Sequence, residues 1–305
     1  MAKTRLPTVT LAVSAFNEEQ NIKLFLKSVL AQKSEGYQLK HIWVFNDGSS
    51  DRTAKQVKAF RSKKISLFDG KQRIGKSSRL NEAYKLLKTD ILIQSDADVI
   101  MAHPCVVRDI IQPLIANENV GMCGGNPLPY PGKTFTEKAV NCTVNAYLPL
   151  RQTLRGGNNV FSCDGRLLAY KRDLVKKIYI PHDMTSNDRY TYYCCLALGY
   201  AFRSVDSAKV YFRSPTNLKD HIRQNGRFVS CPFRMVRYFH PELIKKEEHI
   251  PPGLSALLFV KQYIRHPILC TYIFLTNVYC KYNAQVYEKK ITSLWPMAAS
   301  TKGLI

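Results

Sequence analysis

The sequence has few acidic side chains for its size. It contains 23 Asp plus Glu against 45 Lys plus Arg in 305 residues, which gives a formal net charge of +22. This excess of positive charge favours an anionic partner, and phosphorylated substrates, anionic lipid headgroups and nucleic acid are the candidates. The hydrophobic content of 45% is ordinary for a folded protein, which argues against disorder.

Long apolar runs are also absent. The apolar stretches 249–260 and 266–280 are interrupted by Lys261, Arg265 and Pro267. Neither stretch reaches the roughly 18 residues that a membrane-spanning helix requires, so we expect no such helix. Apolar helices beside positive charge suit an interfacial membrane anchor, and packing against the main domain is the alternative.

The start of the chain and its cysteines lack the marks of an exported protein. The nine cysteines show no CxxC spacing, and the basic N-terminal segment has no apolar stretch of the secretory type. We therefore expect reduced thiols and a cytoplasmic location, with the inner face of the membrane as a peripheral docking site. Cys194 and Cys195 lie in an apolar, tyrosine-rich run and are interpreted as core residues.

Short apolar, β-branched runs alternate with amphipathic segments in the first half of the chain. Strands that alternate with helices predict an α/β, Rossmann-like fold, with a mainly parallel sheet flanked by helices. Asn17 with Gln20 has the form of a capping box. The predicted strands are 9–16, 41–47, 65–69, 91–96 and 120–125, and the predicted helices are 18–30, 51–60 and 78–87.

The second half has a mixed pattern. It predicts a strand and turn at 161–170, a helix at 188–198 and a strand at 200–205, followed by an amphipathic helical tail. We divide the chain into a catalytic domain over residues 1–232 and a basic, apolar helical region over 233–305.

Acidic residues follow the predicted strands. In a parallel sheet the ligand lies at the carboxyl ends of the strands, where Glu18, Asp47, Asp96 and Asp98 would converge. Asp96 and Asp98, at positions i and i+2 after a buried strand, can present hard oxygen ligands to Mg²⁺ or Mn²⁺, which bridges a diphosphate. Asp47 can accept hydrogen bonds from a base or ribose.

Two functional interpretations of these segments are open at this point. Residues 70–77 match the P-loop pattern GxxxxGK[ST], which predicts a phosphotransferase or NTPase with Asp96 at its metal site. A non-enzymatic basic protein that binds nucleic acid is the other alternative, but no RNA-binding signature or regular basic helix stands out. We expect no nucleic-acid partner.

The polar segments of the first half resemble those of family 2 glycosyltransferases with a GT-A fold. Residues 15–19 and 45–53 resemble the two nucleotide-binding segments of that family. Residues 75–81 resemble its GKxxALN segment, which leaves only Gly70 as coincidence in the P-loop match.

The resemblance continues in the second half and covers residues 8–228. Residues 161–172 are similar to the glycine-containing strand and basic turn along the acceptor cleft, and Asn187-Asp188 resembles the ED segment that carries the general base. Residues 224–228 resemble the QxxRW motif of polymer-forming members.

The resemblance implies a metal-dependent, inverting transfer of a sugar from a nucleotide-diphosphate donor, which we expect to be UDP-linked. Asp188, Asp98 and Arg227 would be catalytic, with Asp98 and Asp96 at the metal. The donor-binding residues would be Asn17, Glu18, Asp47, Lys76 and Asp96, and the acceptor or diphosphate residues would be Asp164, Gly165, Asn187, Gln224, Arg227 and Phe228.

The chain departs from the family pattern in two places. Asn187 replaces the usual glutamate and Phe228 replaces the usual tryptophan. Polymer-forming members also have several spanning helices, which we do not expect here. We therefore favour transfer of one or a few sugars to a glycan or a lipid-linked acceptor in cell-envelope or polysaccharide synthesis.

Overall fold

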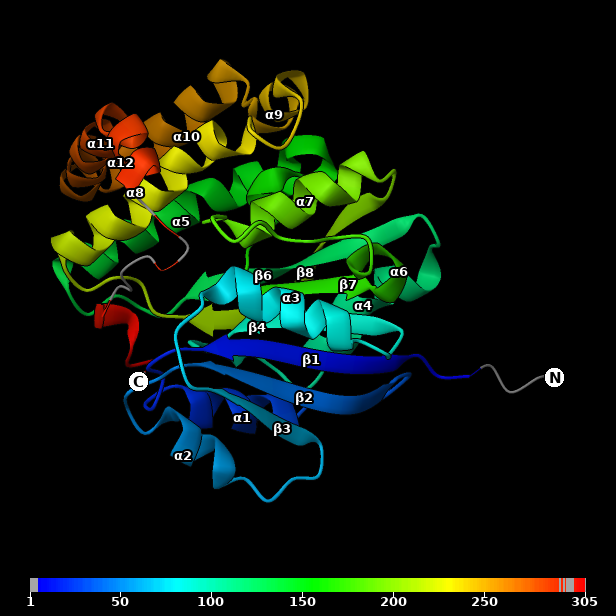
Figure 1. Cartoon of the computed structure of the whole chain (residues 1–305). Coiled ribbons are helices and arrows are strands. Elements are labelled where there is room, and N and C mark those ends of the chain that lie inside the picture. Colours follow the sequence, from blue (N-terminus) through cyan, green and yellow to red (C-terminus); the bar gives the residue numbers. More distant parts are fainter. Residues whose placement is uncertain (1–4, 291, 293, 295–298, 305) are drawn as a thin grey trace.

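A computed structural model describes residues 5–290, 292, 294 and 299–304 (Figure 1). Its described strands form one eight-stranded sheet, in the order β3-β2-β1-β4-β7-β6-β8-β5. β7 and β5 run against the other strands, so the sheet is mixed but mostly parallel. The strands are β1 (Thr8–Ala15), β2 (Gln38–Asp47), β3 (Ile65–Gly70), β4 (Ile91–Asp96), β5 (Val99–Met101), β6 (Val120–Pro129), β7 (Leu167–Lys171) and β8 (Ala201–Phe212).

Helices cover both faces of this sheet, each over its own apolar core. The first core lies under α1 (Ile22–Leu30), α2 (Thr53–Lys58) and α4 (Val106–Ala116). The second lies under α3 (Lys76–Leu86), α6 (Arg172–Val175) and α7 (Asn187–Ala197). Because alternate side chains of a strand point to opposite faces, the β-branched strands can fill both cores.

The predicted α/β architecture is confirmed, with changes at the element ends. The five strands and three helices predicted for the first half are present, and the strand expected at 161–170 begins only at Leu167, after a short 3₁₀ turn at Val160–Ser162. The capping box at Asn17 is wrong. Asn17 has a left-handed φ of 53°, and α1 begins at Ile22 without a side-chain cap.

Four further helices extend α8 (Leu218–Met235) into a C-terminal helical layer, visible at the top of Figure 1. α10 packs on α5 (Phe135–Thr153), α11 packs on α5 and α8, and α12 packs on α8. Arg234 and Glu288 fix the last contact with a buried ion pair of 3.0 Å. The helices are α9 (Pro241–Glu248), α10 (Pro252–Arg265), α11 (Pro267–Tyr282) and α12 (Ala284–Lys290).

The expectation of no spanning helix holds for the described residues, none of whose helices has the length and apolar character to cross a bilayer. The domain boundary at residue 232 stays a prediction, and α8 runs through it. Beyond the helices, residues 299–304 return to the carboxyl end of β1, where the backbone N–H of Leu304 donates to Asn21 Oδ1 at 3.1 Å.

Candidate active site

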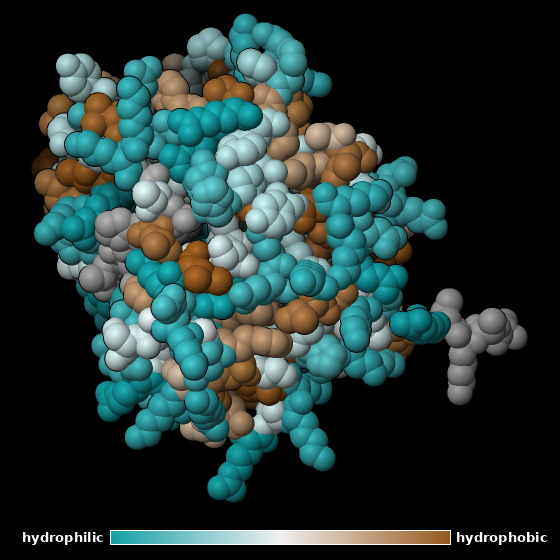
Figure 2. All heavy atoms as spheres, in the orientation of Figure 1, coloured by the Kyte–Doolittle hydropathy of each residue, from teal (hydrophilic) through white to brown (hydrophobic). Residues whose placement is uncertain are grey.

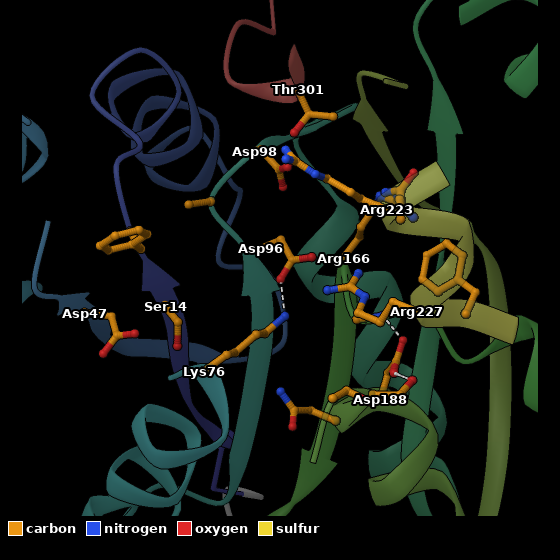
Figure 3. Close-up of a pocket in the computed structure, with 18 of the residues that line it drawn as sticks. Ser14, Asp47, Lys76, Asp96, Asp98, Arg166, Asp188, Arg223, Arg227 and Thr301 are labelled. Atoms are coloured by element: carbon orange, nitrogen blue, oxygen red, sulfur yellow. Dashed lines mark hydrogen bonds and ion pairs between the residues drawn. The ribbon is translucent and has the colours of Figure 1, made fainter. Parts of the chain in front are cut away.

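A cavity of about 530 Å³ lies at the carboxyl ends of β1, β2 and β4, opposite the start of α7 and one face of α8 (Figure 3). It gathers nearly all of the predicted site residues, from segments far apart in the sequence. Those that line it are Glu18, Asp47, Lys76, Asp96, Asp98, Asp164, Gly165, Asn187, Asp188, Gln224, Arg227 and Phe228.

Asn17 is the predicted site residue that does not line the cavity. Its Oδ1 accepts from the backbone N–H of Ser50 at 2.9 Å, and its own N–H donates to Ser49 Oγ at 2.9 Å. Asn17 therefore ties the turn after β1 to the turn after β2, and it shapes the wall of the cavity from behind.

The acidic end of the cavity holds three carboxylates close together. Burial raises the pKa of Asp98, and the charge of Asp96 raises it further. Burial also raises the pKa of Glu18 to about 7, with a further contribution from Asp98. Two lysines partly offset this repulsion, because Lys76 forms an ion pair with Asp96 and Lys302 forms one with Glu18.

These carboxylates fit a hard divalent cation that takes part of its coordination from substrate. Among the described residues, no three His, Cys, Asp or Glu side chains are placed to hold one metal ion together, and the three carboxylates of the acidic end are no exception. Mg²⁺ and similar ions often use one or two carboxylates together with substrate phosphates and water. Burial first, and then the nearby charge of Asp96, raise the pKa of Asp98, and a bound cation would stabilise the ionised form that they disfavour.

Asp47 organises the loop before α3. Its carboxylate accepts from the backbone N–H groups of Ile74 and Gly75 at 2.9 and 3.0 Å, and from Arg79 Nε at 3.0 Å. A carboxylate has about four acceptor positions, so one remains for a ligand. Gly48 lets the loop that contains Gln72 lie close to the turn after β2, because a Cβ at Gly48 would lie only 2.6 Å from the Gln72 carbonyl carbon. Gly48 also has a φ of +71°, which favours glycine.

The same contacts argue against the P-loop reading. A P-loop binds phosphate with its backbone N–H groups, and here Asp47 occupies those of Ile74 and Gly75. Gly70 also has a structural explanation, since a Cβ there would overlap the Arg79 guanidinium and lie 2.7 Å from the Asn46 carbonyl oxygen.

Asp188 lies in the first turn of α7, across the cavity from the acidic end. Its Oδ1 accepts from Ser186 Oγ at 2.8 Å and from the N–H of Arg189 at 2.9 Å, and its Oδ2 accepts from the N–H of Gly165 at 3.2 Å. These three donors hold the carboxylate in one orientation. A Cβ at Gly165 would lie 3.6 Å from both Asp188 Oδ2 and Lys76 Nζ, so glycine keeps this space open.

Asn187 lines the cavity, although its side chain is largely buried. Its Oδ1 accepts from Ser77 Oγ in α3 at 2.8 Å. This bond joins the starts of α3 and α7, and thus fixes Lys76 relative to Asp188. An amide can do this without adding another negative charge to the site, which gives a physical reason for the replacement of the usual glutamate.

The wall formed by β7 and the turn before it carries a half-buried charge pair. Asp164 Oδ2 accepts from Arg166 at 2.8 Å, and the Arg166 guanidinium lies 3.7 Å from the centroid of the Phe212 ring. Burial disfavours the charged form of Asp164, but the positive charges of Arg166 and Arg151 hold its pKa below the ordinary value.

Gln224, Arg227 and Phe228 lie on one face of α8, because positions i, i+3 and i+4 share a helix face. Burial lowers the pKa of Arg227, while Asp188 and Asp96 act against this shift. Phe228 is 41% exposed, and its ring is available to a ligand. Gly226 lets α12 approach, since a Cβ there would lie 3.0 Å from the Tyr287 ring.

Several lining residues were missed from the sequence. Ser14 lies opposite Asp96 in the β1–β4 pairing, and its buried Oγ has no hydrogen-bond partner among the described residues. Arg73 lies 4.2 Å from the centroid of the Phe16 ring. Arg79 does not line the cavity but donates to Asp47, and it could have been found, because it stands at the alanine position of GKxxALN. Further lining residues outside the predicted set include Arg166, Arg223, Tyr287, Lys290, Thr301 and Lys302.

The segment 299–304 crosses the rim of the cavity, a position that no sequence pattern predicts. The N–H of Ser300 donates to Asp220 Oδ2 at 2.9 Å, and Arg213 donates to the carbonyl of Gly303 at 2.9 Å. Between these anchors, Thr301 and Lys302 line the cavity.

Comparison with known proteins gives curated relatives among polysaccharide synthases. The poly-beta-1,6-N-acetyl-D-glucosamine synthase of Staphylococcus aureus is 26% identical over 229 residues, which cover 73% of this chain and 54% of that protein. The Staphylococcus epidermidis synthase is 26% identical over 59% of this chain and 43% of its own length. The chain thus spans about half the length of the curated relatives it matches.

Solved structures show a shared GT-A fold. Mannosyltransferase PcManGT from Pyrobaculum calidifontis, solved with GDP-Man and Mn²⁺, matches with a TM-score of 0.58 at 18% identity, over 93% of this chain and 76% of that chain. Glucosyl-3-phosphoglycerate synthase from Mycobacterium tuberculosis, with Mn²⁺, UDP-glucose and phosphoglyceric acid, matches with a TM-score of 0.51 at 19% identity, over 75% of this chain and 79% of that chain. The model of glycosyl transferase family 2 matches residues 10–179, more than half of the sequence, and this chain therefore belongs to glycosyl transferase family 2.

Proposed function

We propose that this chain is an inverting glycosyltransferase that moves a sugar from a nucleoside-diphosphate donor to a hydroxyl group. The observation that carries the proposal is the meeting of two groups of side chains in one cavity. Carboxylates and lysines gather at the strand ends, and an oriented carboxylate, Asp188, faces them from α7. Sugar transfer needs both groups, since a diphosphate leaves on one side while a hydroxyl loses its proton on the other.

Asp98 and Asp96 would hold the divalent cation, Mg²⁺ or Mn²⁺. When bound, such an ion offsets negative charge on the diphosphate. Two structures with the same fold were solved with Mn²⁺, which supports this choice. Lys76 and Lys302 lie beside these carboxylates and can turn to the diphosphate oxygens when donor binds.

The nucleotide would lie along the ends of β1 and β2. Asp47 has one acceptor position left for a base or ribose, and Ser14 Oγ offers a buried hydroxyl with no described partner. Glu18 closes this end of the cavity, and Asn17 holds the two turns together. We favour a UDP-linked sugar, because the curated relatives are named as N-acetylglucosamine polymer synthases and a structure of the same fold contains UDP-glucose.

Asp188 would act as the general base. The acceptor hydroxyl gives its proton to the carboxylate as its oxygen attacks the anomeric carbon, and the bond from that carbon to the diphosphate oxygen breaks. A single displacement inverts the anomeric centre. The N–H of Gly165 and the Ser186 hydroxyl keep the carboxylate oriented, and Arg227 faces both Asp188 and the charge that develops on the leaving group.

The acceptor would bind between α7 and α8. Phe228 and Tyr287 offer ring faces to a sugar, while Asp164 and Gln224 add polar contacts. Asn187 supports this subsite from below. We favour a glycan or lipid-linked acceptor in cell-envelope or polysaccharide synthesis, in line with the names of the curated relatives.

We also propose peripheral contact with an anionic membrane on the cytoplasmic side. All nine cysteines are free thiols, in keeping with a reducing compartment. Figure 2 shows apolar residues among hydrophilic ones at the upper left, where Figure 1 places α10 to α12. This combination suits an interfacial surface.

A panel of nucleotide sugars with Mn²⁺ tests the enzymatic proposal, by release of nucleoside diphosphate. We expect metal-dependent release from one donor and a loss of roughly 10²-fold or more in Asp98→Asn. Asp173→Asn, whose side chain is 77% exposed on α6, is the matched control and should behave as wild type. Failure to bind or turn over any donor, with triphosphate hydrolysis lost in Lys76→Ala, would overturn the proposal.

A further inference from the structure

A second cavity of about 210 Å³ lies between α5, α10 and α11, apart from the candidate active site. Its walls are mostly apolar side chains from all three helices, with a few uncharged polar groups such as Gln262 and Asn277. Two free thiols, Cys142 and Cys270, lie 3.9 Å apart at Sγ. Typical wall residues are Leu150, Leu258, Phe259, Ile273, Phe274 and Val278. A cavity of this lining suits a hydrocarbon chain rather than a sugar or nucleotide.

One charged side chain occurs among the described residues of this lining, and it is positive. Lys281 is exposed at the end of α11 and forms no ion pair with any residue that the structure describes. An ammonium group beside an apolar interior matches a ligand with an anionic head and an apolar tail.

The surface around the cavity has the same character. No residue of α10 is buried, and Leu257, Ile264 and Ile268 are 65%, 77% and 73% exposed. Residues 249–287 contain no Asp or Glu, so all their formal charge is positive. An exposed apolar surface with only positive charges favours an anionic lipid surface.

A second copy of this chain fits the surface less well. Closed dimers are usually symmetric, so the same patch would face itself. Lys261, Arg265 and Lys281 of both copies would then meet with no carboxylate from residues 249–287 between them.

The cavity is close to the candidate active site through α8. Asn277 lines the apolar cavity, and its Oδ1 accepts from Asn225 Nδ2 at 2.7 Å. Asn225 directly follows Gln224, which lines the active-site cavity. α8 therefore lines the active-site cavity and is hydrogen-bonded to a residue that lines the second cavity.

We propose that the cavity between α5, α10 and α11 binds an acyl chain of an anionic phospholipid, whose phosphate meets Lys281. This proposal makes the proposed membrane contact more specific, because it adds a binding site for one lipid molecule to that surface. It does not depend on sugar transfer, and it is measured without donor or acceptor.

Binding of phosphatidylglycerol to the purified chain tests this proposal, by native mass spectrometry and by flotation with phosphatidylglycerol or phosphatidylcholine vesicles. Ala146→Phe fills the cavity from α5, and Lys281→Glu reverses the charge at its edge. Lys289→Glu, exposed on α12 and outside both linings, makes the same change in net charge and is the matched control.

We expect one retained phosphatidylglycerol per chain for wild type and Lys289→Glu, and binding weaker by roughly tenfold or more for the other two variants. If Ala146→Phe fails to fold, the comparison of Lys281→Glu with Lys289→Glu still shows whether lipid binding depends on the charge at position 281. Equal loss in both lysine variants would show non-specific charge attraction and overturn the proposal. Retention of polyprenyl phosphate but not phosphatidylglycerol, or a dimer that Ala146→Phe dissociates, would also overturn it. Donor hydrolysis, measured separately in lipid-free buffer, shows whether the enzymatic proposal fails or stands on its own.

Discussion

At the scale of single residues, the orientation of Asp188 is the feature most closely tied to chemistry. Its carboxylate accepts three hydrogen bonds, from Ser186, Arg189 and Gly165. Asparagine at this position keeps the size of the side chain and can keep part of this network, but it is not a base. The change thus separates proton removal from local structure.

We expect Asp188→Asn to lower kcat for transfer by roughly 10²-fold to 10⁴-fold, with donor affinity nearly unchanged. The measurement is a steady-state assay with the donor found in the panel, beside direct donor binding by calorimetry. Asp173→Asn serves again as control. A variant with normal kcat would show that Asp188 is not the base.

Site residues could be identified from the sequence where they stand at the end of a predicted strand or directly after it. Asp47, Asp96 and Asp98 were found because the carboxyl ends of parallel strands meet at one edge. The contacts of Arg79 and Ser14 were not predictable in this way, although Arg79 stands out in the sequence at the alanine position of GKxxALN. Their roles depend on contacts with Asp47 and on strand pairing with Asp96, and such partners are set by the fold.

At the scale of elements, the packing of α8 on α11 makes stability depend on pH. His221 of α8 is buried, its Nδ1 has no hydrogen-bond partner among the described residues, and its ring stacks on Tyr272 with centroids 6.0 Å apart. Burial lowers the pKa of His221 from 6.5 to about 4. The unfolded chain therefore takes up a proton at higher pH than the folded chain does.

This contribution to stability is complete above about pH 6.5 and is lost as the pH falls toward 4. Between about pH 7 and pH 5 we expect wild type to lose about 2 kcal/mol more unfolding free energy than His221→Phe. Urea denaturation at both pH values gives the comparison. Equal losses of unfolding free energy in wild type and His221→Phe would contradict the lowered pKa, because they would show that His221 takes up its proton in the folded and the unfolded chain alike.

Some elements could not be predicted from local pattern. β5 has only three residues, too few for a period to be seen. α5 carries Pro149 within it and polar residues on much of its surface, and its start is fixed by a capping box between Thr134 and Glu137. The capping box predicted at Asn17 failed because that side chain bonds to the turn after β2 instead.

At the scale of the whole molecule, the cavity joins distant parts of the chain. Lys302 forms an ion pair with Glu18, although 284 positions separate them in sequence. A donor diphosphate that attracts Lys302 would gain a charge-assisted contact and leave Glu18 free to take up a proton. We expect Lys302→Ala to weaken donor binding by roughly 10-fold to 100-fold.

Calorimetric titration of the donor measures this effect, with Lys302→Arg as the conservative variant and Lys289→Ala as the exposed control. Lys302→Arg should restore much of the affinity, because charge rather than shape is the cause. Equal affinity in wild type and Lys302→Ala would confine Lys302 to a structural role beside Glu18.

The segment 299–304 bears on the modularity of this enzyme. Phe16, Lys76 and Asp188 belong to the predicted catalytic domain, whereas Tyr287 and Lys302 come from the predicted C-terminal region, and all of them line the same cavity. A fragment cut at residue 232 would keep the sheet and its carboxylates but lose part of the rim. The two regions are therefore not interchangeable parts, and exchanging the C-terminal region with that of a relative would also change the catalytic pocket.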